Sequence, residues 1–573
     1  QKELRGTPGL TVLIYDQTCA AEKRRRRKRG TFPDPAKRVF INDEVCEGCG
    51  DCSVQSNCVS VKPLETDLGR KRRIDQSDCN KDFSCLKGFC PSFVTIEGGG
   101  VRRAPKPDLK VVGAEADPFA GLPEPERREL TEPYSILVTG IGGTGVITVG
   151  ALIAMAAHVE GRGATALDFT GLAQKNGAVM SHVRLAPEPE DIHAVRIAAG
   201  GADVILGCDM VVAASPKAIG TMEQGVTRAV LNSAVQPTAA FVQNNDIDLG
   251  EAESADRIRE ALGDDHADFI DATSLAGQIM GDTISSNPFL LGFAWQKGLI
   301  PLSLEAIERA IEINGVAVEA NKQALSWGRL AAHDPDAVRA AAEPRQTAPK
   351  KRPQGFEEIV ADRVRRLTDY QDAAYAARYR TFVERVAAAE KAKAPGRTDL
   401  AEAVARSLFR LMAYKDEYEV ARLYTDPAFM AKVRRQFAGG YRLKFHLAPP
   451  IASARDPETG ELQKREYGPW MIHVFRVLAK LKGLRGTRFD IFGRTEERRM
   501  ERQLIADYMA TIENVLSELD AGNHGLAVQI AEVPEEMRGF GHVKERNVAK
   551  AKRKEQALLA SFRDPMAGVQ AAE

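Results

Sequence analysis

Seven of the nine cysteines in this 573-residue chain lie between positions 46 and 90, and their spacing points to metal chemistry. Cys46-x2-Cys49-x2-Cys52 brings three thiolates together within one short loop. The intervening Gly48 and Gly50 allow the backbone to fold tightly around a compact group. Zinc sites more often pair two separated Cys-x2-Cys motifs, so this spacing favours an iron-sulfur cube, with zinc as the alternative.

A fourth ligand is suggested by Cys90, which is followed by Pro91. In two-cluster ferredoxins the cysteine before a proline ligates the other cluster. One [4Fe-4S] cluster is therefore predicted on Cys46, Cys49, Cys52 and Cys90. Three cysteines of the group remain: Cys58, Cys79 and Cys85. Two full clusters would need eight cysteine ligands, so the remaining three are one short. A second cluster would thus take Asp78 or a water as its fourth ligand, or would contain three irons.

A glycine loop is the second motif that can do chemistry. Gly140-x-Gly142-x-x-Gly145 follows an expected strand at 136–139 and precedes an expected helix at 146–159. This context suits a dinucleotide, whose pyrophosphate would lie on the helix N-terminus, with Asp168 near the position of a ribose-binding acid. The glycines could instead serve only close packing of strand and helix.

The order of expected elements around this loop predicts a mostly parallel sheet covered by helices. Strands are expected at 136–139, 164–167, 179–185, 204–206, 229–231 and 268–270, with helices between them. Toward the carboxyl end, Met500, Leu504, Tyr508, Ile512 and Leu516 recur every four residues, which indicates an amphipathic helix. Irregular segments around Tyr441, His446, Arg538 and His542 suggest an interface.

Composition and charge limit the classes of partner. Lys plus Arg and Asp plus Glu both total 79, so no net charge attracts nucleic acid or an anionic membrane, and neither is expected as a partner. Residues 133–159 lack charged side chains, but their glycines favour a strand, loop and helix over a membrane span. No secretory signal is evident, so we expect a cytoplasmic protein. Cys19 and Cys208 are expected to be small buried side chains.

The amino-terminal segment suggests that the polypeptide is longer than the sequence given. The first residue is Gln1, and Leu10 to Tyr15 reads as a buried strand with nothing before it to pair with. We therefore expect an amino-terminal part that is absent here.

Several segments together resemble a known family. The loop GIGGTG at 140–145, GLAQKNGAVMSHVRL at 171–185, and NPFLLG at 287–292 followed by GLIPL at 298–302 resemble the gamma domain of the 2-oxoacid:ferredoxin oxidoreductases. With the cysteines upstream, the whole arrangement is most similar to the fused indolepyruvate ferredoxin oxidoreductases. The usual glutamine of the loop is replaced by Thr144.

The resemblance implies a multidomain α/β architecture. Its parts would be residues 1–37 as the tail of a thiamine diphosphate-binding domain, 38–100 as a ferredoxin-like iron-sulfur domain, 101–131 as a linker, 132–335 as a Rossmann-like gamma domain, 336–355 as a second linker, and 356–573 as a mainly helical domain. The positions implied to face coenzyme A or a neighbouring domain are Gly140, Gly142, Gly143, Gly145, Gln174, Lys175 and Asn176.

The implied reaction is oxidative decarboxylation of an aryl 2-oxoacid to an acyl-CoA, with electrons passing through iron-sulfur clusters to ferredoxin. Thiamine diphosphate, Mg²⁺ and the catalytic residues would belong to the absent amino-terminal domains, so the chain alone would be inactive, and a homo-oligomer is implied. Two alternatives remain open: an NAD(P)- or flavin-linked iron-sulfur oxidoreductase, and an electron-transfer subunit without catalysis.

Overall fold

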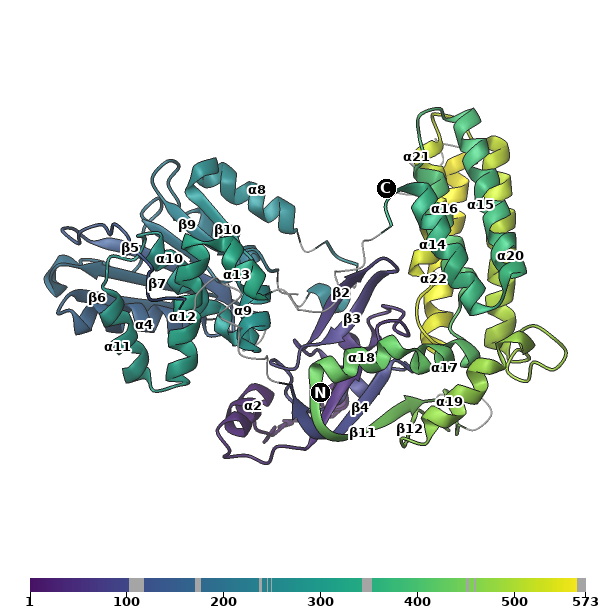
Figure 1. Ribbon diagram of the computed structural model, residues 1–573, viewed down its shortest axis with the longest axis horizontal. Helices are drawn as coiled ribbons and strands as arrows, with labels where there is room; N and C mark the ends of the chain where they lie inside the picture. Colours follow the sequence, from purple (N-terminus) through teal and green to yellow (C-terminus); the bar gives the residue numbers. More distant parts are fainter. Residues whose placement is uncertain are drawn as a thin grey trace.

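The computed structural model describes residues 1–102, 118–170, 177–235, 240–244, 246–248, 250–342, 353–449, 453–457 and 460–563. Its elements form three units, which we call the cysteine-rich unit (37–102), the α/β unit (118–342) and the helical unit (353–563). Figure 1 shows the α/β unit on the left, the helical bundle on the right, and the cysteine-rich unit between and below them. Two short helices, α1 (Lys2–Gly6) and α2 (Ala20–Lys28), precede these units.

The α/β unit is built on a six-stranded sheet in the order β10-β9-β8-β5-β7-β6. The strands are β5 (Tyr134–Ile141), β6 (Gly163–Phe169), β7 (Ala178–Ala186), β8 (Val204–Gly207), β9 (Arg228–Asn232) and β10 (Ala267–Ile270). β10, β9, β8 and β5 pair in parallel, whereas β7 is antiparallel to both β5 and β6. The predicted strands and the mostly parallel sheet are confirmed.

Helices cover the sheet and bury its apolar faces. The helical elements of the unit are α4 (Val146–Val159), η3 (Pro189–Asp191), α5 (Met210–Ala213), α6 (Pro216–Ile219), α7 (Ala240–Gln243), α8 (Glu251–Leu262), η4 (Asp264–His266), α9 (Ala272–Met280), η5 (Thr283–Ser285), α10 (Ser286–Gln296), α11 (Leu304–Asn314), α12 (Val318–His333) and α13 (Pro335–Ala342). The uncharged segment at 133–159 is the buried strand β5 followed by α4, as predicted. In the part of the chain that the structure describes, no helix is both long and apolar enough to cross a membrane.

The NPFLLG segment forms the start of α10, a helix that is buried on nearly every side. A Cβ at Gly292 would lie 2.0 Å from the Leu325 carbonyl oxygen of α12, and one at Gly328 would lie 1.8 Å from the Phe289 oxygen. Only glycine permits backbones to approach this closely. The two glycines therefore set the contact between α10 and α12.

The cysteine-rich unit consists of short elements joined by loops. They are β1 (Lys37–Ile41), α3 (Asp51–Ser56), β2 (Val61–Thr66), β3 (Gly69–Ile74), η1 (Ser84–Lys87) and β4 (Phe93–Val101). β2 and β3 form an antiparallel hairpin, and β1 pairs with β4. The likeness to a ferredoxin fold stays a prediction.

The sheet of this unit is completed by two strands from the helical unit, in the order β1-β4-β11-β12. β11 (Phe437–Leu447) pairs with β4 in antiparallel register, for example Phe445 with Val94, and β12 (Arg465–Tyr467) lies outside it. A bulge between Ala438 and Tyr441 faces Gly98 and Gly99. Tyr441 and His446, expected in an irregular segment, lie on this strand, and their role at an interface stays a prediction.

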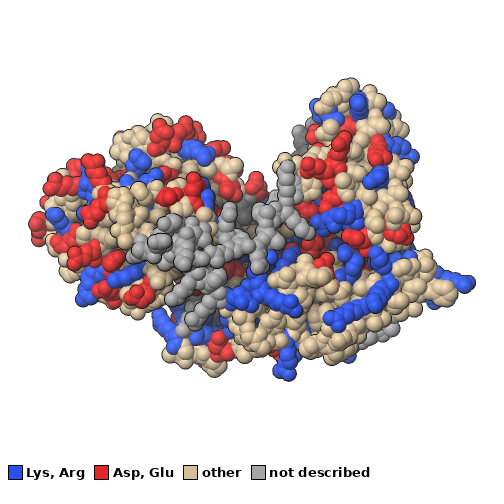
Figure 2. Space-filling model, in the orientation of Figure 1, with Lys and Arg blue, Asp and Glu red and all other residues tan. Residues whose placement is uncertain are grey.

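The remaining elements of the helical unit are α14 (Gly355–Tyr370), α15 (Ala373–Lys393), α16 (Asp399–Met412), α17 (Glu417–Thr425), α18 (Pro427–Gln436), α19 (Met471–Lys480), η6 (Lys482–Leu484), α20 (Glu496–Glu518), α21 (His524–Glu532), η7 (Val533–Glu536) and α22 (Gly541–Arg563). The predicted stripe lies on α20, where Leu504, Tyr508, Ile512 and Leu516 are buried. On the face in Figure 2, basic side chains gather where this unit meets the cysteine-rich unit, at lower right.

The amino-terminal segment and one linker differ from what the sequence predicted. Leu10 to Tyr15 is not a buried strand: Leu10 is 95% exposed and Ile14 84%, because no neighbouring strand in the described residues supplies backbone partners. Cys19 is likewise exposed, whereas Cys208 is buried as predicted. α13 occupies the first part of the segment expected to be a linker at 336–355, and residues 103–117 and 343–352 lie outside the described residues.

Candidate functional site

The first candidate site is a group of four cysteines that the fold of the cysteine-rich unit brings together. Two come from the loop between β1 and α3, one from α3, and one follows η1: Cys46, Cys49, Cys52 and Cys90. Two glycines allow the close contacts. A Cβ at Gly48 would lie 2.1 Å from the Arg70 carbonyl oxygen of β3, and one at Gly88 would lie 2.9 Å from the Cys52 Cα.

Three of these cysteines, Cys46, Cys52 and Cys90, are buried, and the charges of the four thiols affect one another. Burial raises the pKa of Cys49 to about 12, and a negative charge on Cys46 acts in the same sense. Burial also raises the pKa of Cys52, with Cys49, Cys46 and Cys90 contributing. A thiolate group at this place therefore needs a metal or other positive charge to compensate it.

The other three cysteines form a second group. Burial raises the pKa of Cys85 to about 12, with the charges of Cys58 and Cys79 next in size. Burial also raises the pKa of Cys79, and Cys58 contributes. Cys58 therefore groups with Cys79 and Cys85, although in sequence it comes just after Cys52. Cys90 groups with Cys46, Cys49 and Cys52, although in sequence it comes just after Cys85.

The donor set distinguishes between the metal groups that it could hold. In the described part of the chain, no three His, Cys, Asp or Glu side chains converge where a single metal ion could bind. Zinc in a structural site needs four ligands around one ion. In an iron-sulfur cube each thiolate binds a different iron, so the thiolates stand further apart around the cluster. Four cysteine thiolates are the donor set that such a cluster uses.

Two cations lie beside the cysteines. Burial lowers the pKa of the buried Arg72, while the charges of Cys52 and Cys46 oppose that change. Burial lowers the pKa of Lys464 as well, against the charges of Cys90 and Cys85, and its Nζ donates to the Gly88 carbonyl oxygen. Both side chains can offset the negative charge of a thiolate-bound cluster.

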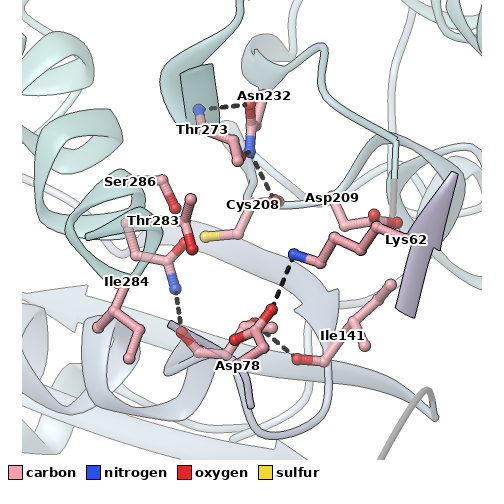
Figure 3. Close-up of a pocket in the computed structure, with 12 residues that line it drawn as sticks. Lys62, Asp78, Ile141, Cys208, Asp209, Asn232, Thr273, Thr283, Ile284 and Ser286 are labelled. Carbon is pink, nitrogen blue, oxygen red and sulfur yellow. Dashed lines mark hydrogen bonds and ion pairs between the residues drawn. The ribbon is translucent and has the colours of Figure 1, made fainter. Parts of the chain in front are cut away.

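A small cavity at the carboxyl ends of the parallel strands is the second candidate site. Its volume is about 40 Å³. Ile141, Cys208 and Asn232, which lie at or just after the ends of β5, β8 and β9, line it. This is the crevice where open α/β sheets bind ligands. Figure 3 shows Lys62 reaching toward Asp78 at one side, with Thr283 and Ser286 at the other.

Lys62 and Asp78 come from the cysteine-rich unit, so this cavity lies between two units. Lys62 Nζ is 2.6 Å from Asp75 Oδ2 and 2.7 Å from Asp78 Oδ2. Asp78 also pairs with Arg24 Nη1 at 3.3 Å. Because Asp78 is held by these two cations, the geometry argues against its expected role as a cluster ligand.

The glycine loop borders the same cavity through Thr144. Gly143 and Gly145 have φ of 86° and 97°, and Gly145 precedes the first turn of α4. A Cβ at Gly140 would lie 2.5 Å from Val146 Cγ2, so this glycine serves close packing. Asn287 Nδ2 donates to the Thr144 carbonyl oxygen at 2.9 Å, which ties the loop to α10. Gln174, Lys175 and Asn176 lie outside the described residues.

Asp168 does not lie where a dinucleotide on this loop would need it. The loop follows β5, Asp168 lies on β6, and the antiparallel strand β7 separates the two. Two strand spacings amount to about 10 Å. In a dinucleotide fold the acid follows the strand directly beside the glycine strand. This topology disfavours the interpretation of the motif as an NAD site.

Sequence reasoning missed several residues that shape the cysteine site. Arg72 and Lys464 were not singled out, nor was Tyr424, whose hydroxyl donates to the Pro91 carbonyl oxygen at 2.6 Å. Tyr424 and Lys464 are more than 330 residues from the cysteines in sequence. No local pattern could have indicated them.

Comparison with known proteins identifies the α/β unit. Residues 135–331 match the family model "Pyruvate ferredoxin/flavodoxin oxidoreductase", and residues 356–557 match "Family of unknown function (DUF6537)". Subunit IorB of indolepyruvate oxidoreductase from Thermococcus kodakarensis is 29% identical over 206 residues, which are 35% of this chain and 96% of that protein. The same subunit from Pyrococcus horikoshii is 28% identical over 208 residues, with the same coverage.

Two solved structures are also similar. Pyruvate oxidoreductase subunit PORC from Thermotoga maritima is 23% identical, covers 35% of this chain and 96% of its own, and gives a TM-score of 0.26. The 2-oxoglutarate:ferredoxin oxidoreductase from Magnetococcus marinus is 19% identical, covers 40% of this chain and 36% of its own, and gives a TM-score of 0.28. TM-scores this low add nothing to the fold assignment.

The α/β unit therefore matches the pyruvate ferredoxin/flavodoxin oxidoreductase family over residues 135–331, in line with the resemblance that the glycine loop and the NPFLLG segment indicated. The IorB subunits are matched over 96% of their own length. The two cysteine groups and the helical unit lie outside residues 135–331, which the family model matches.

Proposed function

We propose that the chain is the electron-transfer and gamma portion of an indolepyruvate-type 2-oxoacid:ferredoxin oxidoreductase. The reaction would be oxidative decarboxylation of an aryl 2-oxoacid to an acyl-CoA, with ferredoxin as electron acceptor and partner. The observation that carries the proposal is the family match of the α/β unit in a chain that also holds two groups of cysteines, four of whose seven members are buried. The names of the IorB relatives support an aryl substrate.

The residues of this chain would act as the electron path. Four thiolates, Cys46, Cys49, Cys52 and Cys90, would hold a [4Fe-4S] cluster, and Cys58, Cys79 and Cys85 would hold part of a second. Such clusters supply one-electron transfer. Arg72 and Lys464 would offset the negative charge, and the hydrogen bond from the Tyr424 hydroxyl to the Pro91 carbonyl oxygen would hold the segment that carries Cys90.

The remaining cofactors belong to the rest of the proposed enzyme. Thiamine diphosphate, Mg²⁺ and the catalytic residues would be on amino-terminal domains, of which residues 1–37 would be the tail. Coenzyme A, or the neighbouring domain, would meet the loop at Gly140, Gly142, Gly143 and Gly145, with Lys175 and Asn176. The enzyme would work as a homo-oligomer in the cytoplasm.

Metal analysis of anaerobically purified chain tests the electron path. We expect brown protein with iron and acid-labile sulfide, broad thiolate-to-iron absorption, and a paramagnetic signal after reduction. Stoichiometric zinc without iron would contradict the proposal. The variant Cys46→Ser should lose the signal of the first cluster, whereas Cys208→Ser, which changes a buried cysteine outside both groups, should keep it.

The substrate is tested with the chain joined to its thiamine diphosphate domains. We expect coenzyme A-dependent reduction of ferredoxin with indolepyruvate, at higher kcat/KM than with pyruvate or 2-oxoglutarate. The isolated chain should give no turnover. Turnover by the isolated chain, or a preference for pyruvate, would contradict the assignment.

A nicotinamide-linked enzyme is the rival interpretation, and calorimetry separates the two. Because β7 lies between the glycine loop and Asp168, we expect NADH and NADPH to bind no tighter than about 1 mM, or about −4 kcal/mol. Asp168→Ala should leave this value unchanged. A micromolar complex that Asp168→Ala weakens would support the rival.

A further inference from the structure

The second cysteine group contains an aspartate at a position that the first group gives to a cysteine. The first loop reads Cys46-x2-Cys49-x2-Cys52, and the later one reads Cys79-x2-Asp82-x2-Cys85. The spacing is the same, with Asp82 in place of Cys49. A role for Asp82 as a ligand rests on the proposed function, because that function includes a second iron-sulfur cluster on Cys58, Cys79 and Cys85.

The backbone of the two loops is alike at this position. Cys49 is flanked by Gly48 and Gly50, with φ of 72° and 76°. Asp82 is flanked by Lys81 and Phe83, with φ of 53° and 61°. A positive φ is costly for residues with a side chain, and only two others in the described residues adopt it: Asn57 and Ala317. The loop around Asp82 therefore has the same backbone shape as the loop around Cys49. In the Cys49 loop glycines allow this shape, whereas in the Asp82 loop it costs conformational energy.

The elements after the two loops also correspond. Gly50 is the residue before α3, and Phe83 is the residue before η1. Each loop thus presents its middle side chain just before a helical turn. α3 and η1 pack against each other, so the two loops lie side by side in the fold.

The hydrogen bonds within the loops repeat as well. Gly48 N–H donates to Cys46 Sγ at 3.4 Å in the first loop, and the backbone N–H of Lys81, two residues after Cys79, faces that thiol in the later loop. The Asp51 N–H donates to the Cys49 thiol, and Ser84 N–H donates to Asp82 Oδ1 at 3.1 Å. The carboxylate of Asp82 therefore occupies the place of the Cys49 thiol in the same pattern.

Asp82 lies midway between two cysteines of its own group, three residues after Cys79 and three before Cys85. Asp78, the other nearby carboxylate, is instead held by Lys62 and Arg24. Asp82 also accepts from Ser84 Oγ at 2.9 Å and is exposed, and no Lys or Arg among the described residues forms a salt bridge with it.

We propose that Asp82 is the fourth ligand of the second iron-sulfur cluster, together with Cys58, Cys79 and Cys85. A carboxylate oxygen is a harder ligand than a thiolate and binds iron in a cluster less firmly. Because Asp82 faces solvent, the iron it holds is the one that is lost first. Oxidation then converts [4Fe-4S]²⁺ into [3Fe-4S]⁺, with release of one Fe²⁺ and of one electron that the added oxidant takes up.

The test compares iron loss from the anaerobically prepared chain and its variants after one equivalent of ferricyanide. Wild type, with about eight irons, should lose about one iron and gain the paramagnetic signal of an oxidised three-iron cluster. Asp82→Cys should lose iron at least tenfold more slowly. Asp82→Ala should contain the three-iron cluster as purified. Asp78→Asn, the matched control, should behave as wild type.

Each contrary result has a distinct meaning. Equal iron loss from wild type and Asp82→Cys, or a full second cluster in Asp82→Ala, would overturn the assignment of Asp82. Loss of the fourth iron in Asp78→Asn alone would assign that residue instead. About four irons in wild type would remove the second cluster but leave the proposed function standing, whereas zinc without iron would remove both.

Discussion

At the residue scale, His446 shows how the shared sheet alters a titratable group. It lies on β11, and its Nε2 is 2.6 Å from Thr95 Oγ1 of β4. Burial lowers its pKa from 6.5 to about 4, and the charge of Lys464 acts in the same sense, while Glu466 opposes it. The folded protein therefore holds His446 neutral at a pH where the unfolded chain is already protonated.

This difference predicts a loss of stability in mild acid. As pH falls from 6.5 toward 4, the unfolded state binds a proton that the folded state does not, so the free energy of unfolding decreases. Between pH 7.5 and 5.5 the decrease from His446 should be about 1.4 kcal/mol. Urea titration at both values should show that His446→Gln removes this part of the slope. The exposed His333→Gln serves as control, and an unchanged slope in His446→Gln would refute the assignment.

At the element scale, β11 and the helices around it form an aromatic cluster. The ring centroids of Tyr424 and Phe445 are 5.1 Å apart, as are those of Phe445 and Phe475. All three side chains are buried. These contacts hold β11 against α17 and α19, and the backbone pairing of β11 with β4 joins the helical unit to the cysteine-rich unit.

Truncation of the central ring should loosen this junction. Phe445→Ala should destabilise the protein by about 3–5 kcal/mol, because it leaves a cavity among rings that cannot collapse. Thermal unfolding should show the lower midpoint, and limited proteolysis should show faster cleavage near β11. Trp470→Ala changes a side chain that is 54% exposed and should cost about 0.5 kcal/mol or less. Similar losses for both variants would contradict the packing argument.

At the scale of the whole molecule, the apolar cores do not follow the boundaries expected from sequence. The α/β unit has cores made only from its own residues. The core of the cysteine-rich unit includes residues from 420–540, such as Val420 and Phe540. Salt bridges add to this junction, for example Arg363 with Asp67 at 3.1 Å. The cysteine-rich and helical units therefore depend on each other.

Fragments should reveal this dependence. We expect residues 118–342 to fold alone, with cooperative thermal unfolding. We expect residues 37–102 alone to be aggregated or unfolded, because Phe93, Val94 and Ile96 would lose the partners that bury them. Circular dichroism and gel filtration would measure both. A soluble fragment 37–102 that binds iron would show that the shared core is dispensable.

The sequence by itself determined what depends on local order. The strands and helices around Gly140 to Gly145, the amphipathic face of α20, and the spacing of Cys46, Cys49 and Cys52 were all readable, because periodicity and glycine positions reflect local backbone geometry. The resemblance of the α/β unit to a known family could also be predicted, because it depends on short continuous segments such as the glycine loop and NPFLLG.

Only the tertiary structure decided which distant residues meet. It placed β7 between the glycine loop and Asp168, paired Phe445 with Val94, and gave the neighbours of Asp82 a left-handed backbone. Strand order and side-chain grouping depend on contacts between segments up to several hundred residues apart. Such contacts leave no periodic trace in a single sequence.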